Sequence, residues 1–189
     1  MMKLSSPALL LLAAWTITAS AHHAFDPLRD SEGRQSYAVV DGTVRVFRIV
    51  NPHGVLIVNV AGESGEATPW LIELNPATQL AREGWTDDIV AVQDRVSVAL
   101  ALSRAKNRGR LRAMLIHPSE SGTAARLFVA YGIRGDTPVM QRLRERLPSC
   151  GSLNEEIGRT ACFLIDADAL RKLEAEFPGP MGYAMEDSE

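Results

Sequence analysis

Histidines are the residues of this sequence whose types and spacing are best suited to chemistry. The chain has four, and His22 and His23 are adjacent, directly after the small residues Ala19-Ser20-Ala21. His53 follows in the segment Asn51-Pro52-His53. Imidazole nitrogen is the commonest side-chain ligand for metal ions. His22, His23 and His53 are therefore the candidate metal ligands.

The start of the chain has the features of a secretory signal peptide. Lys3 supplies a positive charge, Ala8–Ile17 is apolar, and Ala19-Ser20-Ala21 offers small residues for cleavage. The apolar run is too short for a bilayer-spanning helix, which needs about 20 residues. We therefore predict that residues 1–21 are a signal peptide and that the protein is periplasmic or secreted. No transmembrane segment is expected in the mature chain.

Cleavage after Ala21 would leave His22 with a free α-amine, whose ordinary pKa is about 8. The amine and Nδ1 of His22 can close a chelate ring on one metal ion. His53 would then complete a three-nitrogen site of the kind called a histidine brace. Nitrogen-rich tetragonal coordination suits Cu(II). Zinc is the second choice, since it also accepts three nitrogens and a water.

His23 does not fit the same brace, because adjacent side chains diverge in an extended segment. It becomes a ligand in an alternative site. Cleavage after Ser20 would leave Ala21-His22-His23 as the amino terminus, with a histidine at the third position. Both cleavage sites therefore predict a terminus that can bind copper.

Patterns typical of β-strands dominate residues 37–117. Five segments are rich in β-branched residues or alternate apolar with polar residues: Tyr37–Val50, Val55–Val60, Trp70–Leu74, Arg95–Leu102 and Leu111–His117. Asp41-Gly42 suggests an interruption or bulge in the first. A short helix is predicted over Ala77–Glu83, between the third and fourth segments. Asn75 is its expected N-cap, Pro76 follows, and Gly84 ends it.

Three strands, a helix and two strands is the element order of an OB-type barrel. We predict a mainly β fold in which residues 22–120 form a five-stranded OB-like barrel, with the short helix between strands 3 and 4. The apolar side of the strands should be buried, and its expected members include Val58, Ile72, Val98 and Leu115.

Residues 121–189 are predicted to form an α-rich C-terminal extension. Leu127–Ile133 alternates like a further strand, and Thr137–Leu147 has the pattern of a helix. A second helix begins at a cap, either Asp166 or Asp168. Cys150 and Cys162 are an even pair that would form a disulfide in an oxidising compartment. Their spacing does not match a zinc motif.

The charge balance argues against a nucleic-acid partner. The chain has 20 basic and 23 acidic residues, a formal net charge of −3. Positive charge is concentrated at Ser103–Arg112, around the turn between the fourth and fifth strands. This segment is either a contact for an anionic envelope component or a solvated turn.

An enzyme is the function class with the least support. The patterns G-x-S-x-G, H-E-x-x-H and the P-loop do not occur. Glu73 is a lone carboxylate, expected on a solvated face or beside an arginine. Trp70 and Trp85 are expected to pack in the core and in a turn rather than to bind a ligand.

Five short motifs occur in one order along the chain: Ala21–Phe25, Gly42–Val44, Asn51–His53, Trp70–Leu74 and Leu80–Thr86. They resemble a family of small exported bacterial domains of unknown function, whose members carry AHHSF, GTV, NPH, W-x-x-E-L and L-x-R-x-G-W-T. Ala24 stands where the family has serine, and Gln93-Asp94 where it has Gly-Asp. The resemblance implies an exported domain and no particular activity. A copper-binding module and a non-metal envelope interaction module both remain open.

Overall fold

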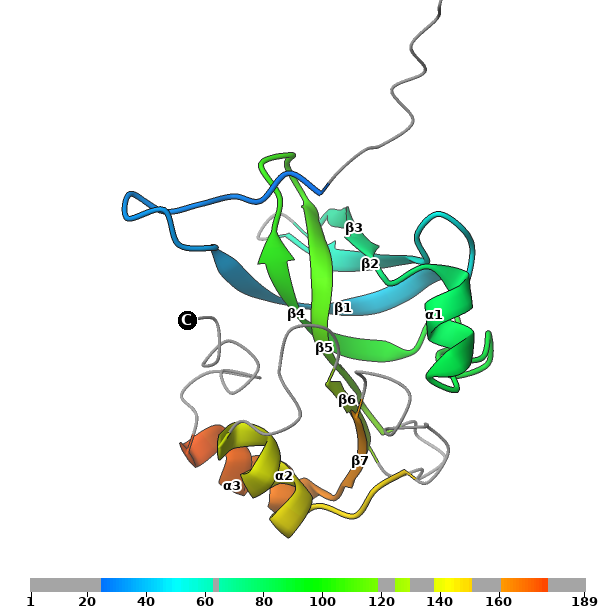
Figure 1. The fold of residues 1–189 in the computed structure, drawn as a ribbon, viewed down its shortest axis with the longest axis vertical. Helices are drawn as coiled ribbons and strands as arrows, with labels where there is room; N and C mark the ends of the chain where they lie inside the picture. The colour runs from blue at the N-terminus through cyan, green and yellow to red at the C-terminus, as the bar shows by residue number, and fades with distance from the viewer. Residues whose placement is uncertain (1–24, 63–64, 119–124, 130–137, 151–160, 177–189) are drawn as a thin grey trace, which may run out of the picture.

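Five strands close into a β-barrel in the computed structural model, which describes residues 25–62, 65–118, 125–129, 138–150 and 161–176. They are β1 (Tyr37–Arg48), β2 (Val55–Ala61), β3 (Ala67–Glu73), β4 (Arg95–Leu102) and β5 (Arg108–Ile116) (Figure 1). The neighbours run β3-β2-β1-β4-β5, and a parallel pairing of β3 with β5 closes the ring. The mainly β fold and its five-stranded barrel are confirmed.

Helix α1 (Ala77–Arg82) lies between β3 and β4. Asn75 is not its N-cap, because the helix begins after Pro76 without a cap from a neighbouring side chain. Instead, Ala77 N donates a hydrogen bond of 3.1 Å to Oδ1 of Asn51, in the loop between β1 and β2. Gly84 ends the helical segment at a φ of 83°, the left-handed conformation typical of this position. The loop that carries His53 is therefore tied to the start of α1.

Strand β1 is continuous through Asp41-Gly42, where an interruption was one of the expectations. Glycine is required there because β2 passes close by: a Cβ on Gly42 would lie 2.2 Å from the carbonyl oxygen of Asn59. The irregularity comes later, where the pairing with β2 shifts between Val44 and Val46.

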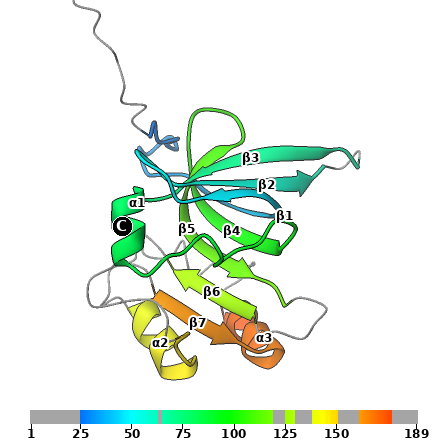
Figure 2. The ribbon, with the colours of Figure 1, turned by 90° about the vertical axis from the view of Figure 1, so that its right-hand side faces the viewer.

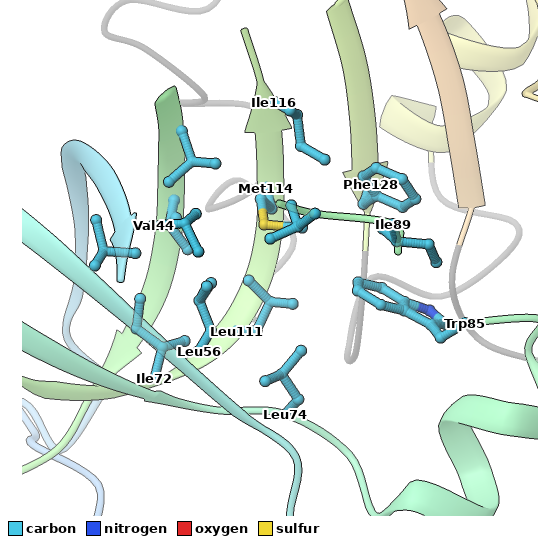
Figure 3. Packing of buried hydrophobic residues seen from close by; sticks show 14 of the residues in the cluster. Val44, Leu56, Ile72, Leu74, Trp85, Ile89, Leu111, Met114, Ile116 and Phe128 are labelled. Atoms are coloured by element: carbon cyan, nitrogen blue, oxygen red, sulfur yellow. The ribbon is translucent and has the colours of Figure 1, made fainter. Parts of the chain in front are cut away.

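Strand β5 contributes to two hydrophobic cores, one on each face, and its pairing with β4 shifts between Ala99 and Leu100. One extra residue in a strand moves the following side chains to the opposite face. Leu111, Met114 and Ile116 consequently belong to the barrel core (Figure 3). Leu115 faces the second core.

The burial predicted for the barrel strands is confirmed. Val58, Ile72 and Val98 are fully buried in the barrel core, and Leu115 is 2% exposed. The alternation in Leu111–His117 predicts that Leu111 and Leu115 share a face, and this prediction is wrong. The shift in β5 interrupts the alternation between these two residues, so Leu115 packs in the second core.

The sheet continues past the barrel through β6 (Ala125–Val129) and β7 (Ala161–Ile165), which pair in the order β5-β6-β7. Helices α2 (Pro138–Arg146) and α3 (Ala167–Glu176) lie on the far side of these strands from the barrel (Figure 2). The extension was predicted to be α-rich, and the prediction did not include β7. That strand is a short apolar run without alternation, because both of its faces pack. Asp166 is the cap of α3: its Oδ1 accepts a hydrogen bond of 2.7 Å from Ala169 N.

Strands β6 and β7 separate the two cores. Phe128 and Cys162 pack in the barrel core. Leu127 and Phe163 pack with Leu143 of α2 in the second core. The extension is therefore built onto the barrel wall through buried apolar contact.

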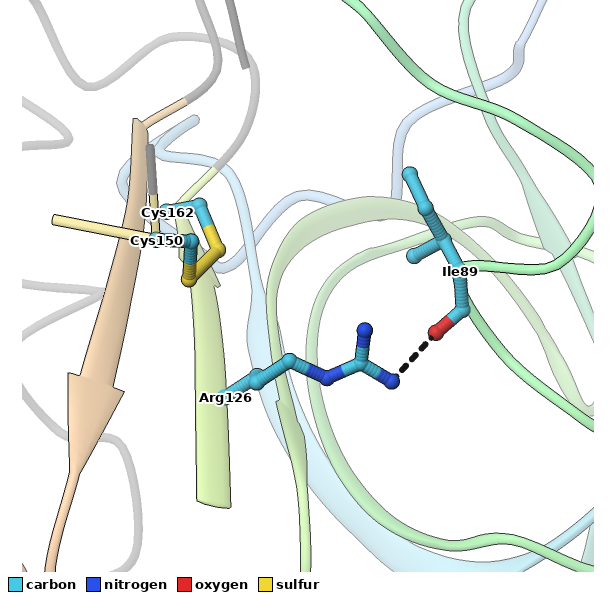
Figure 4. Close-up of a disulfide and its surroundings, with 4 residues drawn as sticks. All are labelled: Ile89, Arg126, Cys150 and Cys162. Atoms are coloured by element: carbon cyan, nitrogen blue, oxygen red, sulfur yellow. Dashed lines mark hydrogen bonds between the residues drawn. A yellow bond between two sulfur atoms is a disulfide. The ribbon is translucent and has the colours of Figure 1, made fainter. Parts of the chain in front are cut away.

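The predicted disulfide between Cys150 and Cys162 is present (Figure 4). It fastens the segment before Cys150 along β7. There Leu164 N donates a hydrogen bond of 2.8 Å to Pro148 O, and Cys150 N donates one of 3.0 Å to Cys162 O. Nearby, Arg126 of β6 donates a hydrogen bond of 2.7 Å to the carbonyl oxygen of Ile89. No helix of the described residues has both the length and the apolar character needed to cross a membrane.

Candidate functional site

His53 lies in the loop between β1 and β2, after a cis peptide bond between Asn51 and Pro52. The backbone next to it is held against the end of β3 by two hydrogen bonds. Gly54 N donates one of 3.0 Å to Asn75 O, and Leu74 N donates one of 2.9 Å to Gly54 O. Its imidazole is half-buried and makes no hydrogen bond or ion pair with the residues that the structure describes. His53 is therefore positioned by its backbone, with its side chain available as a ligand.

The amino-terminal segment is held on the hairpin of β4 and β5. Arg104 N donates a hydrogen bond of 3.0 Å to Asp26 O, and Leu28 N donates one of 2.8 Å to Leu102 O. The guanidinium of Arg110 lies over the ring of Phe25, with its Cζ 4.9 Å from the centroid. Phe25, the first described residue, is thus anchored at the start of β5.

A tight turn carries this segment back into β1. Its centre is Asp30, whose carboxylate accepts hydrogen bonds of 2.9 Å from the backbone N–H groups of Glu32 and Arg34. The bond from the backbone of Arg34 lowers the pKa of this exposed carboxyl below its ordinary value, because it stabilises the charged form. The turn fixes the path of the chain from Phe25 to the barrel.

Glu73 lies at the seam where β3 and β5 close the barrel. It pairs with Val55 of β2 on one side and with Arg110 of β5 on the other. The residue is half-buried, and its Oε2 is a buried atom with no hydrogen-bond partner in the described parts of the chain. The seam therefore brings one carboxylate between the His53 loop and the anchored Phe25.

His22 and His23 precede the described residues, so the structure does not place them. Within the described ranges, no group of three or more His, Cys, Asp and Glu side chains could hold a metal ion. Of the three predicted ligands, His53 alone is located. Glu73 was not predicted as a site residue, because one sequence does not reveal that β3 pairs with β5. The signal for it was a charged residue among the apolar residues of Trp70–Leu74.

His117 belongs to a separate cluster at the end of β5. Ser97 Oγ donates a hydrogen bond to Oδ1 of Asp41 and lies 2.8 Å from Nε2 of His117. A hydroxyl has one proton, so Nε2 must be the donor toward Ser97. A catalytic triad needs the opposite arrangement, with the histidine accepting the proton of the serine. The cluster does not activate Ser97 as a nucleophile.

The basic segment around the β4–β5 turn is partly engaged within the protein. Nε of Arg104 lies 3.6 Å from the carboxylate of Asp26. Arg110 lies over Phe25. Lys106 and Arg108 are exposed to solvent. Part of this charge therefore holds the amino-terminal segment in place.

Comparison with known proteins supports one assignment. The model of a family of unknown function, DUF6152, matches residues 9–112, which is more than half of the chain. The matched part contains β1 to β4, the His53 loop and Glu73. No curated protein and no solved structure matches the chain. The chain therefore belongs to DUF6152, a family of unknown function.

Proposed function

We propose that this protein is an exported copper-binding module whose ion is held by His22 and His53. The observation that carries the proposal is the anchoring of Phe25 on Arg110, two strands away from the His53 loop. Two strand spacings are about 10 Å. Three residues of extended chain, from Phe25 back to His22, also span about 10 Å. A mature terminus at His22 can therefore reach the half-buried imidazole of His53.

We also assign the barrel to the OB type. The ring order β1-β2-β3-β5-β4, the parallel β3–β5 pairing and the helix between β3 and β4 support this assignment. In OB barrels, ligands bind over strands 2 and 3 and at the loops that join strands 1–2 and 4–5. His53, Glu73 and the anchored Phe25 lie at these places. By analogy of fold, ligands of OB barrels bind where the residues of this chain indicate a site.

Export is part of the proposal, because the brace needs the α-amine that cleavage after Ala21 would free. The disulfide supports it: such bonds form and persist in oxidising compartments such as the bacterial periplasm. The signal-peptide pattern of residues 1–21 supports it independently.

Intact-mass spectrometry of the protein recovered from the periplasm, together with its metal content, tests the proposal. We expect a mature chain that starts at His22 and carries about one equivalent of copper at neutral pH. Zinc in place of copper would revise the metal. A mature chain that starts at Ala21 would contradict the brace of His22 and His53, and a mature chain that holds no metal would contradict copper binding.

The second candidate function is a non-metal envelope interaction module, favoured by the solvent-exposed Lys106 and Arg108. It predicts that replacing Lys106 and Arg108 by serine abolishes retention on vesicles of anionic phospholipid. The copper proposal predicts instead that this variant keeps its affinity for Cu(II) within about twofold, because no proposed ligand changes. Surface substitutions of this kind should change the free energy of unfolding by no more than about 0.5 kcal/mol. Vesicle retention that the substitutions leave unaltered would contradict the envelope function at this surface.

A further inference from the structure

We infer that the carboxylate of Glu73 is an oxygen ligand of the copper ion held by His22 and His53, an inference that rests on the proposed function. The first observation is the state of Oε2. It is a buried carboxylate oxygen without a hydrogen-bond partner in the described parts of the chain. Buried polar atoms in folded proteins nearly always have a partner, so an orphaned oxygen needs an explanation. A bound cation would supply the missing interaction.

The second observation is the position of Glu73 beside the His53 loop. It lies directly across from Val55, and Val55 follows His53 by two residues. The hydrogen bonds of Gly54 with Leu74 and Asn75 keep the His53 loop against this end of β3. Adjacent strands are about 4.8 Å apart, a gap that a glutamate and a histidine side chain together can close around one ion.

The third observation concerns Arg110, the cation opposite Glu73 on β5. Its guanidinium lies over the ring of Phe25, and Glu73 makes no ion pair with a described residue. The barrel thus brings Arg110 and Glu73 together without pairing them. Arg110 positions the amino-terminal segment, and the carboxylate stays available for the ion.

The donor set is consistent with Cu(II). The α-amine and Nδ1 of His22 and the imidazole of His53 supply three nitrogens. A carboxylate oxygen in the fourth position completes a tetragonal N,O set, which Cu(II) prefers. The negative charge of Glu73 also offsets part of the charge of the ion, which the neutral nitrogen ligands do not.

Titration of Cu(II) into the mature protein, followed by electron paramagnetic resonance, tests the inference. Glu73→Gln should lower the affinity by about tenfold or more, since even residues that only support a ligand contribute this much. The spectrum should change because an oxygen donor is lost. Glu73→Asp keeps the charge on a shorter side chain and should give an intermediate affinity. Glu66→Gln, an exposed carboxylate after β2, is the matched control and should leave both readouts unaltered. Circular dichroism establishes that each variant is folded.

The outcomes separate this inference from the proposed function. If His53→Ala abolishes binding while Glu73→Gln and Glu73→Asp change neither affinity nor spectrum, Glu73 is not a ligand and the copper site stands. Tighter binding by Glu73→Gln would also overturn the inference. It would mean that the carboxylate pairs with the α-ammonium of His22 and competes with the metal. If no histidine or glutamate variant changes binding, the proposed function itself fails.

Discussion

A variant with one extra residue before His22 is expected to lose copper binding while remaining folded. The added residue turns the α-amine of His22 into a peptide nitrogen, so the chelate ring with Nδ1 cannot form. The α-amine and Nδ1 belong to one residue, so once one of them binds the ion the other is held close to it. Loss of the amine should therefore weaken binding by roughly a hundredfold or more. No contact of the barrel core changes. Titration of Cu(II) at neutral pH measures the loss, and an unaltered unfolding transition is the control.

Substitutions of single histidines distinguish the two amino-terminal sites. With cleavage after Ala21, His53→Ala should weaken binding strongly. With cleavage after Ser20, His23→Ala should be the damaging change and His53→Ala should have no effect. His117→Ala is the control in both cases, because His117 bonds Ser97 about 20 Å along β5 from Arg110. Equal, weak binding by all variants would contradict both sites.

The pH dependence of binding follows from the same ligands. Protons compete with the metal for the imidazole nitrogens and for the amine. Affinity should therefore fall as the pH drops below about 6, where free imidazole is mostly protonated. Affinity that does not change between about pH 5 and pH 8 would exclude these nitrogens as ligands.

Trp85→Ala is expected to have the largest effect on stability among the substitutions considered. Trp85 is 3% exposed, and its ring lies between Phe47 of β1 and Phe128 of β6, with centroid distances of 6.2 and 5.2 Å. It thus joins the barrel to the extension (Figure 3). Replacing a buried tryptophan by alanine typically lowers the free energy of unfolding by about 3–5 kcal/mol, since a cavity remains.

Denaturant titration followed by circular dichroism measures this cost. Val92→Ala is the matched control, because Val92 is 60% exposed and its truncation should cost less than about 0.5 kcal/mol. Trp70, which is half-buried on β3, should give an intermediate value. A cost below about 1 kcal/mol for Trp85→Ala would contradict the role of Trp85 as the joint between the two parts.

The barrel could be predicted from the sequence because its signals are local. Runs of β-branched residues located the first two strands and alternation the other three, and Gly84 located the end of α1 at a position that requires a left-handed backbone. Cys150 and Cys162 were the only cysteines, so their pairing had no competitor. Each of these signals lies within a few residues or follows from composition.

The rest depended on contacts between distant segments. The pairing of Glu73 with Arg110 across the closure of the barrel creates the orphaned carboxylate, and no local pattern encodes it. The first helical N–H bonds to Asn51 and not to the predicted cap Asn75, because the fold brings the loop between β1 and β2 to the start of α1. The extra residue in β5 moved Leu115 to the second core, and β7 lacked alternation because both of its faces are covered.

The segment along β7 also determines what this sheet presents to other molecules. A sheet that continues past a closed barrel has a last strand, and an uncovered last strand is a template for adding strands from other chains. Residues Pro148–Cys150 occupy that position on β7, and the disulfide ties them to it. We expect the bond to protect this edge from association with a second copy. We also expect the same chain, folded under reducing conditions, to aggregate more readily, whatever its affinity for metal.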